Sequence, residues 1–374
     1  MRVLQFAKFY PPERGGMESI VRELTVGLNA AGCPTDVLCA HRRWRSADER
    51  TEAGWRVVRA GVLGTWLSTS LSLSTLAWAR RLLPEYDVVH VHMPNPLAAL
   101  ALWWARPACR VVVHWHSDVV NQQRALKLYE PLQRWLLTRA DAIVATSPPY
   151  ADHSPALYPW RGKVAVIPLG IGDNLKQPDP GRVATMRSSW PGKRIIFSLG
   201  RMASYKGFDT LIEAARSLPD DAVVVVGGAG PRLAAHRARV AALGLDKKVF
   251  FVGPVDEEDI PAYHEAADVF CMPSLTRAEA FGVAQLEAMR AGRPVVCSAI
   301  EGSGVAWVTV DGTTGLTAAP GSPDSLAAAL NRLLQDASAA ARMGAAGRAR
   351  YLDHFTAGTM VAKIAALYVR ITNP

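Results

Sequence analysis

The sequence predicts an α/β fold built from two doubly wound parallel-sheet domains. Hydrophobic residues follow strand-like and helix-like periods that alternate almost throughout the 374 residues. A chain of this length is too long for one ordinary core, since domains usually hold about 100–200 residues. Residues 167–181, IPLGIGDNLKQPDPG, are rich in Pro, Gly and Asp and have little periodicity. We therefore expect the linker between the two domains there.

The first half is expected to begin with a buried strand, because the apolar run near the N-terminus is short. Lys8 and the Pro-Pro pair after it interrupt that run, so we do not expect it to be a secretory signal. Helices are predicted between the strands, notably at 17–31 and 122–138. The strands predicted in this half are 2–6, 35–40, 56–60, 87–91, 110–114 and 141–145.

The second half alternates more regularly between the two periods. Its strands are predicted at 194–199, 222–227, 248–252, 268–272 and 294–298. Its helices are predicted at 207–217, 231–243, 257–266, 282–291, 323–334 and 338–353. A weaker turn is predicted around 306–318.

Composition indicates a globular protein whose first half is basic. The net charge is +9, and residues 1–170 hold 20 Lys and Arg against 13 Asp and Glu, with nine of the eleven tryptophans. Such a half can bind nucleic acid, an anionic membrane surface or an anionic substrate, or it can simply carry solvated arginines. No aromatic stacking platform on a sheet is evident, so we expect no nucleic-acid partner. The five cysteines form no CxxC pair, which favours reduced thiols and a cytoplasmic protein.

Ligands of open parallel sheets bind outside the carboxyl ends of the strands, so the residues that follow strands carry the functional predictions. The sequence GRMASYKGFDTL follows the predicted strand that ends at Leu199. Gly200 lets the chain turn, and Arg201 and Lys206 precede a helix that begins near Gly207. Two cations beside a helix N-terminus suit a pyrophosphate group. The alternative is an ordinary loop with solvated charges.

A second candidate is RAEAFGVAQLEAMRAGRPVV, residues 277–296, which places two glutamates around a helix start. Glu279 is expected on the loop above the helix and Glu287 inside it. If both were helical they would lie about 12 Å apart along the axis. That distance is near the span from a sugar ring across a diphosphate to a ribose, and the amides of Gly282 and Val283 would face the diphosphate. In the alternative, Glu279 only favours the helix N-terminus and Glu287 is solvated.

The same stretch, extended to PSLTRAEAFGVAQLEAMRAGRPVV, closely resembles the E-x7-E signature of family 4 glycosyltransferases. These are retaining enzymes with the fold of two Rossmann-like domains known as GT-B. GRMASYKGFDTLIEAA, FFVGPVDEEDIPAYHEAADVF and GSGVAWVTVDGTTGL are similar to further motifs of the family, in the family's order, over residues 194–318. KFYPPERGGMESIVREL, HVHMPNP and VVVHWHSDVV resemble its glycine loop and middle strands. The likeness is greatest to bacterial mannosyl- and rhamnosyltransferases of surface-polysaccharide assembly.

The resemblance implies a role for each motif residue. Arg201 and Lys206 would hold the diphosphate of a nucleotide-sugar donor, Glu279 would bind hydroxyls of the donor sugar, and Glu287 would bind the ribose. Backbone at 253–255 would line the base, and the glycines before the helix at 17–31 would close over the diphosphate. The donor-binding residues implied in this way are Gly15, Gly16, Gly200, Arg201, Lys206, Gly253, Val255, Glu279, Phe281, Gly282, Val283 and Glu287.

A histidine is also implied near the donor sugar. His116 in HWHSD takes that position, and His114 competes with it. The catalytic residues implied are His116, Glu279, Arg201 and Lys206.

No metal and no cofactor are expected. Both HxH pairs, His90/His92 and His114/His116, place their members on one face of a strand. Zinc needs three or four ligands, and no cysteine lies near these pairs in the sequence. No Asp-x-Asp occurs in the chain, which disfavours a metal-bridged diphosphate.

The resemblance also implies how function is divided along the chain. Residues 1–170 would form an acceptor-binding domain and residues 171–355 a donor-binding domain, with a C-terminal helix at 356–374 that packs back on the first. The expected activity is transfer of a hexose, with retention of configuration, to a hydroxyl of a lipid-linked or growing surface glycan. The favoured hexose is mannose or a deoxyhexose, supplied by a GDP-sugar. A UDP-sugar-dependent transferase of the same family, a nucleotide-sugar epimerase and a non-catalytic nucleotide-sugar-binding protein are the alternatives.

Three segments of the first half set tryptophan beside arginine: 41–45 (HRRWR), 66–83 and 97–106. Tryptophan and arginine on short apolar helices are typical of a surface that docks at a membrane interface, although the same spacing also suits a core. No run of 18 apolar residues exists, so we expect no bilayer-spanning segment. If these side chains are exposed, we expect a cytoplasmic protein in peripheral contact with the anionic inner leaflet of the cytoplasmic membrane.

Overall fold

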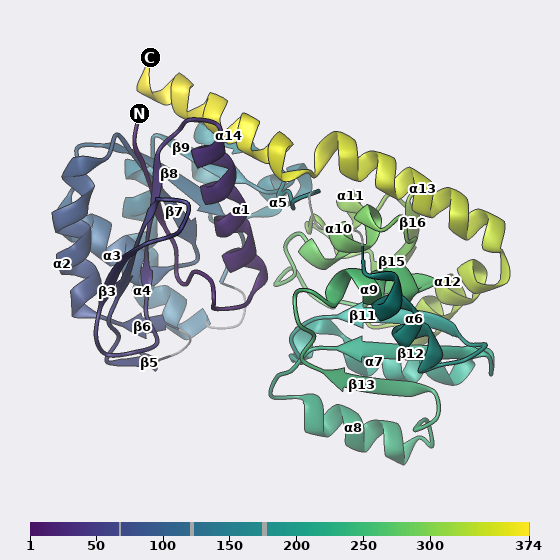
Figure 1. The fold of residues 1–374 in the computed structure, drawn as a ribbon. Helices are drawn as coiled ribbons and strands as arrows, with labels where there is room; N and C mark the ends of the chain where they lie inside the picture. Colours follow the sequence, from purple (N-terminus) through teal and green to yellow (C-terminus); the bar gives the residue numbers. More distant parts are fainter. Residues whose placement is uncertain (67–68, 120–122, 174–177, 374) are drawn as a thin grey trace. The chain divides into compact units, whose positions relative to one another are not determined.

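The computed structural model describes residues 1–66, 69–119, 123–173 and 178–373. The chain forms two compact units, and each is an α/β structure around a mainly parallel sheet (Figure 1). Unit 1 consists of Met1–Gly170 and Ala357–Pro374, and unit 2 of Ile171–Thr356. The α/β class predicted from the alternating periods is confirmed.

The sheet of unit 1 has eight strands in the order β10-β9-β8-β7-β1-β2-β4-β3. Neighbouring strands are parallel except that β3 runs antiparallel to β4. Its strands are β1 (Val3–Phe6), β2 (Thr35–Ala40), β3 (Ala47–Arg50), β4 (Arg56–Ala60), β7 (Val88–Met93), β8 (Arg110–Trp115), β9 (Ala142–Ala145) and β10 (Val164–Val166). Two short strands, β5 (Gly64–Trp66) and β6 (Thr69–Leu71), form a separate antiparallel pair.

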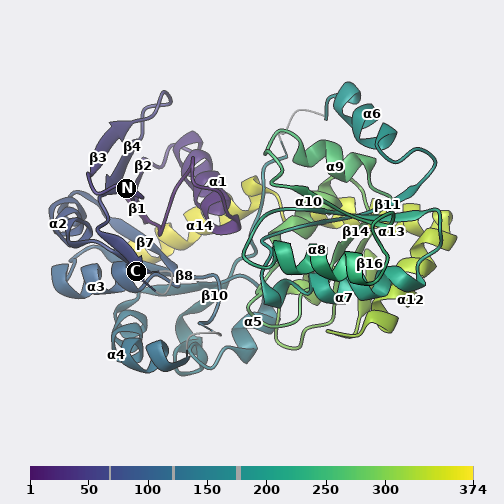
Figure 2. The same ribbon diagram turned by 90° about the horizontal axis from the view of Figure 1, so that it is seen from below.

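Helices cover both faces of this sheet. The helices are α1 (Gly16–Ala30), α2 (Leu73–Leu82), α3 (Pro96–Ala105), α4 (Gln123–Arg139), α5 (Pro148–His153) and α14 (Ala357–Thr372). Figures 1 and 2 place α2 and α3 on one face and α1 with α14 on the other. Gly27 permits the close approach of α1 to α14, because a Cβ atom there would lie 2.5 Å from Cγ2 of Val361. The C-terminal helix is thus an integral part of unit 1.

Unit 2 contains a six-stranded, fully parallel sheet in the order β13-β12-β11-β14-β15-β16. Its strands are β11 (Arg194–Leu199), β12 (Ala222–Gly227), β13 (Val249–Gly253), β14 (Val269–Met272), β15 (Val295–Ser298) and β16 (Gly315–Ala318). Its helices are α6 (Pro180–Ser188), α7 (Phe208–Ala214), α8 (Leu233–Ala242), α9 (Ile260–Ala266), α10 (Val283–Arg290), α11 (Val305–Val308), α12 (Pro323–Gln335) and α13 (Ala337–His354).

The core of unit 2 lies between this sheet and the apolar faces of α7 and α12, which pack against each other. Val224 of β12, Val269 of β14 and Val296 of β15 are fully or almost fully buried there. Consecutive strands and crossover helices of this kind leave the loops after the strands at one edge of the sheet, where parallel sheets bind ligands.

The predicted strands agree with their observed counterparts to within about two residues. Five observed strands were not predicted: β3, β5, β6, β10 and β16. Residues 306–318, where a weaker turn was predicted, contain most of α11 and all of β16. The other differences concern helix ends. The helix predicted at 257–266 begins at Ile260, with Pro261 in its first turn. Proline lacks an N–H group and is tolerated at the first helical positions, so the helix cannot extend far before it. The helix predicted at 207–217 is α-helical only to Ala214 and ends in a 3₁₀ turn. Residue 122 of the helix predicted at 122–138, and residues 174–177 of the predicted linker, lie outside the described residues.

Among the described residues, no helix is both long enough and apolar enough to cross a membrane. All five cysteines are unpaired, and four of them are buried.

Candidate functional site

The loop after β11 contains the two predicted cations of unit 2. It begins at Gly200, whose amide donates to the Gly227 carbonyl across 3.1 Å, and it ends in a 3₁₀ turn, η3 (Ser204–Lys206). Gly207 then starts α7 with a φ of 72°, in the left-handed region that favours glycine. A Cβ atom on Gly207 would lie 1.9 Å from the carbonyl oxygen of Pro273. Glycine therefore allows the loop after β11 to touch the loop after β14.

Lys206 reaches across this contact to the second motif. Its Nζ lies 2.5 Å from Oε2 of Glu279, and the same oxygen accepts a hydrogen bond from Oγ of Ser274 at 3.1 Å. The two side chains are only 15% and 11% exposed. Burial lowers the pKa of the Lys206 ammonium group, but the adjacent Glu279 carboxylate outweighs that effect and the pKa is raised overall. Lys206 therefore remains a cation at neutral pH, whereas Arg201 lies exposed on the same loop.

The backbone around Glu279 is held at several points. Its amide donates to the carbonyl of Thr276 at 3.0 Å, and its carbonyl accepts from Oγ of Ser303 at 2.5 Å. The next carbonyl, that of Ala280, accepts from the Gly304 amide at 2.8 Å. These bonds fix the carboxylate above the start of α10 instead of leaving it on a free loop.

The N-terminus of α10 has the geometry that the sequence predicted, with Gly282 as the residue before the helix. Its φ is 78°, and a Cβ atom would lie 2.4 Å from Cε of Met272. The first amides of a helix have no partner within it. Among the described residues, the amides of Gly282 and Val283 donate no backbone hydrogen bond. The side chain of Phe281 is buried and packs edge-on against Phe355, so only its backbone can face a ligand.

Glu287 lies in the second turn of α10 and is partly exposed. Its Oε2 is 3.6 Å from Nε2 of His264, beyond hydrogen-bond distance. Burial lowers the pKa of His264, which therefore stays neutral at pH 7. Glu287 consequently keeps hydrogen-bonding capacity for another group.

The last two predicted residues of unit 2 lie at the end of β13. Gly253 has a φ of 79°, and its carbonyl accepts from the Gly228 amide at 2.7 Å. Val255 packs over Gly227, where a Cβ atom would lie 2.7 Å from its Cγ2. The loops after β11, β12, β13 and β14 thus meet at one edge of the sheet, and they carry all the predicted donor-binding residues of unit 2 apart from those on α10.

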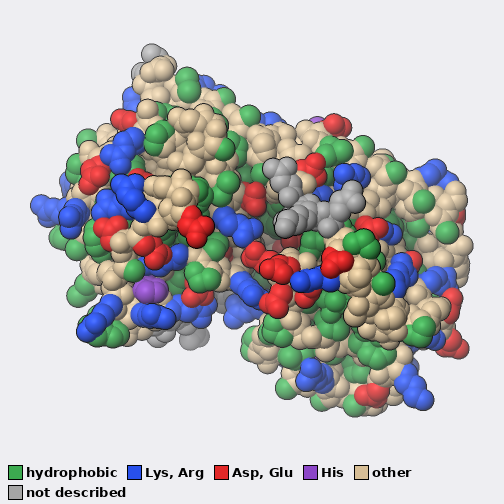
Figure 3. Space-filling view, in the orientation of Figure 1, with side chains coloured by type: hydrophobic (Ala, Val, Ile, Leu, Met, Phe, Trp, Pro, Cys, Tyr) green, Lys and Arg blue, Asp and Glu red, His purple; other side chains and the backbone are tan. Residues whose placement is uncertain are grey.

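In unit 1, Gly15 and Gly16 are exposed at the start of α1. His116 follows β8 and is 8% exposed, whereas His114 within β8 is completely buried. Burial lowers the pKa of His116 to about 3, so its ring is neutral at pH 7. Figure 3 shows Lys and Arg side chains intermixed with acidic ones on the face of unit 1 that is seen there.

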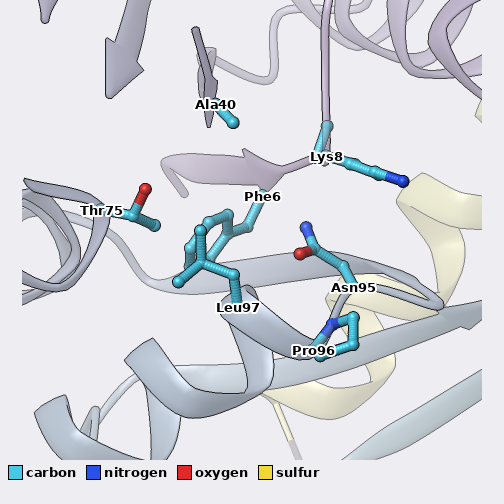
Figure 4. A pocket seen from close by; sticks show the side chains of 8 residues that line it. Phe6, Lys8, Ala40, Thr75, Asn95, Pro96 and Leu97 are labelled. Atoms are coloured by element: carbon cyan, nitrogen blue, oxygen red, sulfur yellow. The ribbon is translucent and has the colours of Figure 1, made fainter. Parts of the chain in front are cut away.

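A small pocket lies near the carboxyl end of β1 (Figure 4). Lys8 extends away from the other labelled side chains in that view. The pocket is lined by Phe6, Ala7, Lys8, Ala40, Thr75, Asn95, Pro96 and Leu97, which differ from the predicted site residues.

Three of the histidines, His90, His92 and His114, have ring nitrogens within 4.8 Å of one another. Their rings are stacked with centroids 4.8–5.4 Å apart and planes inclined by 1–26°. The lone pair of an imidazole nitrogen lies in the ring plane, so nearly parallel, stacked rings cannot direct three lone pairs at one ion. This geometry does not fit a metal site.

Several residues that position the predicted site residues were not predicted from the sequence. Ser274 and Ser303 contact Glu279, and His264 lies beside Glu287. The only sequence signal for Ser274 is its position directly after a buried strand. Ser303 and His264 carry no such signal, because their contacts depend on how the strands are ordered in the sheet.

Two family models match the chain. The model for glycosyl transferases group 1 matches residues 187–350, and the model for a glycosyl transferase 4-like domain matches residues 15–170. The chain is 34% identical to O-antigen chain mannosyltransferase C of Escherichia coli, over 99% of both chains. It is 36% identical to D-rhamnosyltransferase WbpZ of Pseudomonas aeruginosa PAO1, over 96% of this chain and 93% of that one.

A third relative is a GDP-mannose-dependent alpha-(1-6)-phosphatidylinositol monomannoside mannosyltransferase of Mycolicibacterium smegmatis, 31% identical over 96% of both chains. Among solved structures, the sucrose-phosphate synthase of Thermosynechococcus elongatus superposes with a TM-score of 0.82 at 23% identity, over 99% of both chains. HepE of Anabaena, in complex with UDP and glucose, superposes with a TM-score of 0.81 at 20% identity, over 99% of this chain and 100% of that one. These structural likenesses concern the fold, which is that of GT-B glycosyltransferases.

Proposed function

The chain belongs to the group 1 glycosyl transferases, and we propose that it moves a hexose, mannose or a deoxyhexose, from a GDP-sugar to a hydroxyl of a lipid-linked or growing surface glycan. Relatives named as mannosyl- and rhamnosyltransferases, one of them GDP-mannose-dependent, support this donor and this product class. The observation that carries the proposal is the Lys206–Glu279 pair at the start of α10, with the exposed Arg201 on the same loop as Lys206.

Each group of unit 2 has a role that follows from its chemistry. Arg201 and Lys206 bind the donor diphosphate and stabilise the negative charge that develops on it as it leaves. The amides at the α10 N-terminus support them. Glu279 accepts hydrogen bonds from hexose hydroxyls, and Glu287 accepts them from the ribose. Gly200, Gly253 and Val255 line the nucleotide.

The transfer is proposed to retain the configuration of the sugar. The leaving diphosphate, held by the two cations, receives the proton of the incoming hydroxyl on the same face of the ring. The new glycosidic bond forms as the sugar–phosphate bond breaks, so no enzymic nucleophile is needed. The cations of the protein perform the charge stabilisation that a metal ion would otherwise provide. From the family resemblance, His116 contributes beside the donor sugar, and Gly15 and Gly16 close over the diphosphate.

The substitution Glu279→Gln tests this function, because it keeps the shape of the side chain but removes its charge. We expect kcat to fall by about 100-fold or more, with cooperative unfolding preserved. Transfer from GDP-mannose is measured by product analysis, with and without excess EDTA, and EDTA is expected to leave the wild-type rate unchanged. Full activity of the variant would refute the assignment of Glu279.

The donor base is tested separately by thermal shift with GDP-, UDP-, ADP- and dTDP-sugars. A ligand present at 100 times its Kd stabilises the folded protein by about 2.7 kcal/mol, so the true donor class stands out. We expect the largest shift with a GDP-sugar. A larger shift with a UDP-sugar would reassign the donor.

We also propose that unit 1 contacts the anionic inner leaflet from the cytoplasmic side. Trp44 is 69% exposed with the guanidinium of Arg45 4.6 Å from its ring, and Trp103 and Trp104 of α3 are 43% and 46% exposed. Aromatic and basic side chains of this kind anchor proteins at a membrane interface. Sedimentation with anionic vesicles, but not with zwitterionic ones, is the expected result. Failure of the protein to sediment with either kind of vesicle would contradict the proposed membrane contact.

A further inference from the structure

A groove of about 880 Å³ lies at the amino edge of the unit 1 sheet, where β1, β7 and β8 begin. The C-terminal ends of α2, α3 and α14 border it, and Met1 and Asn373 both line it (Figure 1). His116 and the glycines before α1 follow their strands and therefore belong to the opposite edge. The volume is within the range of ligand sites, about 300–1,000 Å³, and none of the predicted site residues lines the groove.

Arginines outnumber acids in this groove. Arg80, Arg106 and Arg110 line it, together with the single carboxylate of Asp87, whose Oδ2 already accepts a backbone hydrogen bond at 2.7 Å. Arg110 is paired with Asp141 at 3.0 Å. Arg80 and Arg106 are exposed, and within the described residues neither guanidinium contacts a carboxylate or donates a hydrogen bond. Both arginines therefore keep their donors for an anion from outside the chain.

Arg106 adopts a backbone conformation that arginine rarely takes. It follows the last residue of α3 with a φ of 45° and a ψ of 63°, and among the described residues it is the only non-glycine with a positive φ. A Cβ atom makes this left-handed conformation costly, and glycine is the usual residue there. A guanidinium in the last turn would complement the helix dipole without that cost. Capping of α3 alone thus gives no reason for arginine at this position.

The groove adjoins an exposed apolar stripe on α3. Leu100, Trp103 and Trp104 follow the i, i+3, i+4 spacing of one helix face, and all three are exposed. Arg80 of α2 connects the stripe with the groove, since its guanidinium carbon lies 5.4 Å from the centre of the Trp104 ring. Aromatic rings beside arginines suit a lipid interface, where the rings reach the acyl boundary and the guanidinium groups meet phosphates.

We propose that this groove binds the phosphate of an anionic membrane lipid, which Arg80 and Arg106 contact while Trp103 and Trp104 enter the bilayer interface. The site rests on the membrane contact proposed above for unit 1, and it gives that contact a ligand and two binding side chains. A lipid suits this surface better than an acidic protein segment, because one lipid supplies both an anion for the arginines and apolar surface for the tryptophans.

The substitution Arg106→Gly tests the proposal, because it removes the guanidinium and relieves the left-handed conformation at the same time. Its midpoint of urea unfolding should not fall. Its affinity for vesicles of phosphatidylglycerol and phosphatidylcholine, measured by sedimentation of the full chain, should fall about fivefold. Arg80→Gln should lower the affinity by a similar factor. A stable Arg106→Gly protein with undiminished affinity would contradict a role of Arg106 in lipid binding.

Arg237→Gln is the matched control, since Arg237 is an exposed arginine of α8 in unit 2 and the change removes the same charge. It should bind these vesicles as the wild type does. An equal loss of affinity in this variant would overturn the site, because net charge would then explain the binding. Unchanged affinity in both groove variants would overturn the site but not the membrane contact. Failure of the wild type to bind would overturn both, whereas hexose transfer is measured separately in solution.

Cys109 lines the same groove and reports whether it is occupied. It is the only one of the five cysteines that is not buried. Partial burial raises the pKa of its thiol to about 11, so alkylation by a maleimide is slow enough to follow by mass spectrometry. Anionic vesicles should slow this alkylation several-fold in the wild type and much less in Arg106→Gly. Equal protection by zwitterionic vesicles, or by inorganic phosphate alone, would overturn the assignment to an anionic lipid.

Discussion

At the scale of single residues, the pairing of Lys206 with Glu279 combines two chemistries in one place. The ammonium group suits a phosphate and the carboxylate suits sugar hydroxyls, and the two lie 2.5 Å apart although both are largely buried. The sequence predicted both residues, because each follows a strand and matches a family motif. It could not predict the contact between them, since residues 73 positions apart meet only when β11 and β14 become neighbours.

Removal of one member of this pair should cost stability as well as activity. Lys206→Met leaves the Glu279 carboxylate buried without its partner, and we expect the free energy of unfolding to fall by about 3 kcal/mol. The double variant Lys206→Met/Glu279→Gln should recover most of that loss, because it removes both charges. Urea unfolding gives the free energy of unfolding of the wild type, the single variant and the double variant. Neither variant should transfer hexose. A double variant less stable than the single one would show that the pair is not the cause.

At the scale of elements, helix and strand positions followed from periodicity, whereas helix ends depended on single residues. Pro261 fixes the start of α9 later than the apolar pattern suggested. Gly207 and Gly282 start the two helices of the site in the left-handed region. The glycines themselves were evident in the sequence. The close contacts that require them, with Pro273 and Met272, are tertiary and were not.

Gly207→Ala is expected to destabilise unit 2 strongly. The substitution combines a positive φ with a Cβ atom 1.9 Å from a backbone oxygen, and we expect a loss of at least about 2 kcal/mol. Gly244→Ala is the matched control, because its φ is 67° but no atom lies within 4 Å of the added Cβ. It should lose only the cost of the left-handed conformation, about 1 kcal/mol. Equal losses in urea unfolding would refute the role of the contact.

The buried histidines of β7 and β8 should make unit 1 sensitive to acid. Burial lowers the pKa values of His90, His92 and His114 well below 6.5, and that of His116 to about 3. Below the unfolded pKa near 6.5 the unfolded chain binds more protons than the folded one. The stability that the neutral histidines contribute is therefore fully present above about pH 6.5. It is lost progressively as the pH drops toward their pKa values in the folded protein.

His114→Leu tests this dependence, because neither nitrogen of His114 has a partner among the described residues. The variant should be at least as stable as the wild type at pH 7. Between about pH 6 and pH 4 the free energy of unfolding of the variant should fall less steeply than that of the wild type. The two slopes should differ by about 1.4 kcal/mol per pH unit, because the variant lacks one proton-binding group. Urea unfolding at several pH values gives both slopes, and identical slopes would contradict the account.

At the scale of the whole molecule, two α/β units of similar construction carry different kinds of polar group at the carboxyl ends of their strands. Unit 2 gathers cations, carboxylates and helix amides, whereas unit 1 gathers neutral, buried histidines linked to its C-terminal helix. The sequence predicted this division through its motifs. It gave no sign that Tyr368 belongs with the histidines, because nothing near the C-terminus marks a polar partner for β1 and β7.

The most direct measurement is a crystal structure of the protein with an intact GDP-sugar. We expect the Lys206 ammonium and the Arg201 guanidinium to contact the diphosphate. The Glu279 carboxylate should lie within hydrogen-bond distance, about 3.2 Å, of a hexose hydroxyl. A donor bound elsewhere, with Lys206 and Glu279 still joined only to each other, would contradict it.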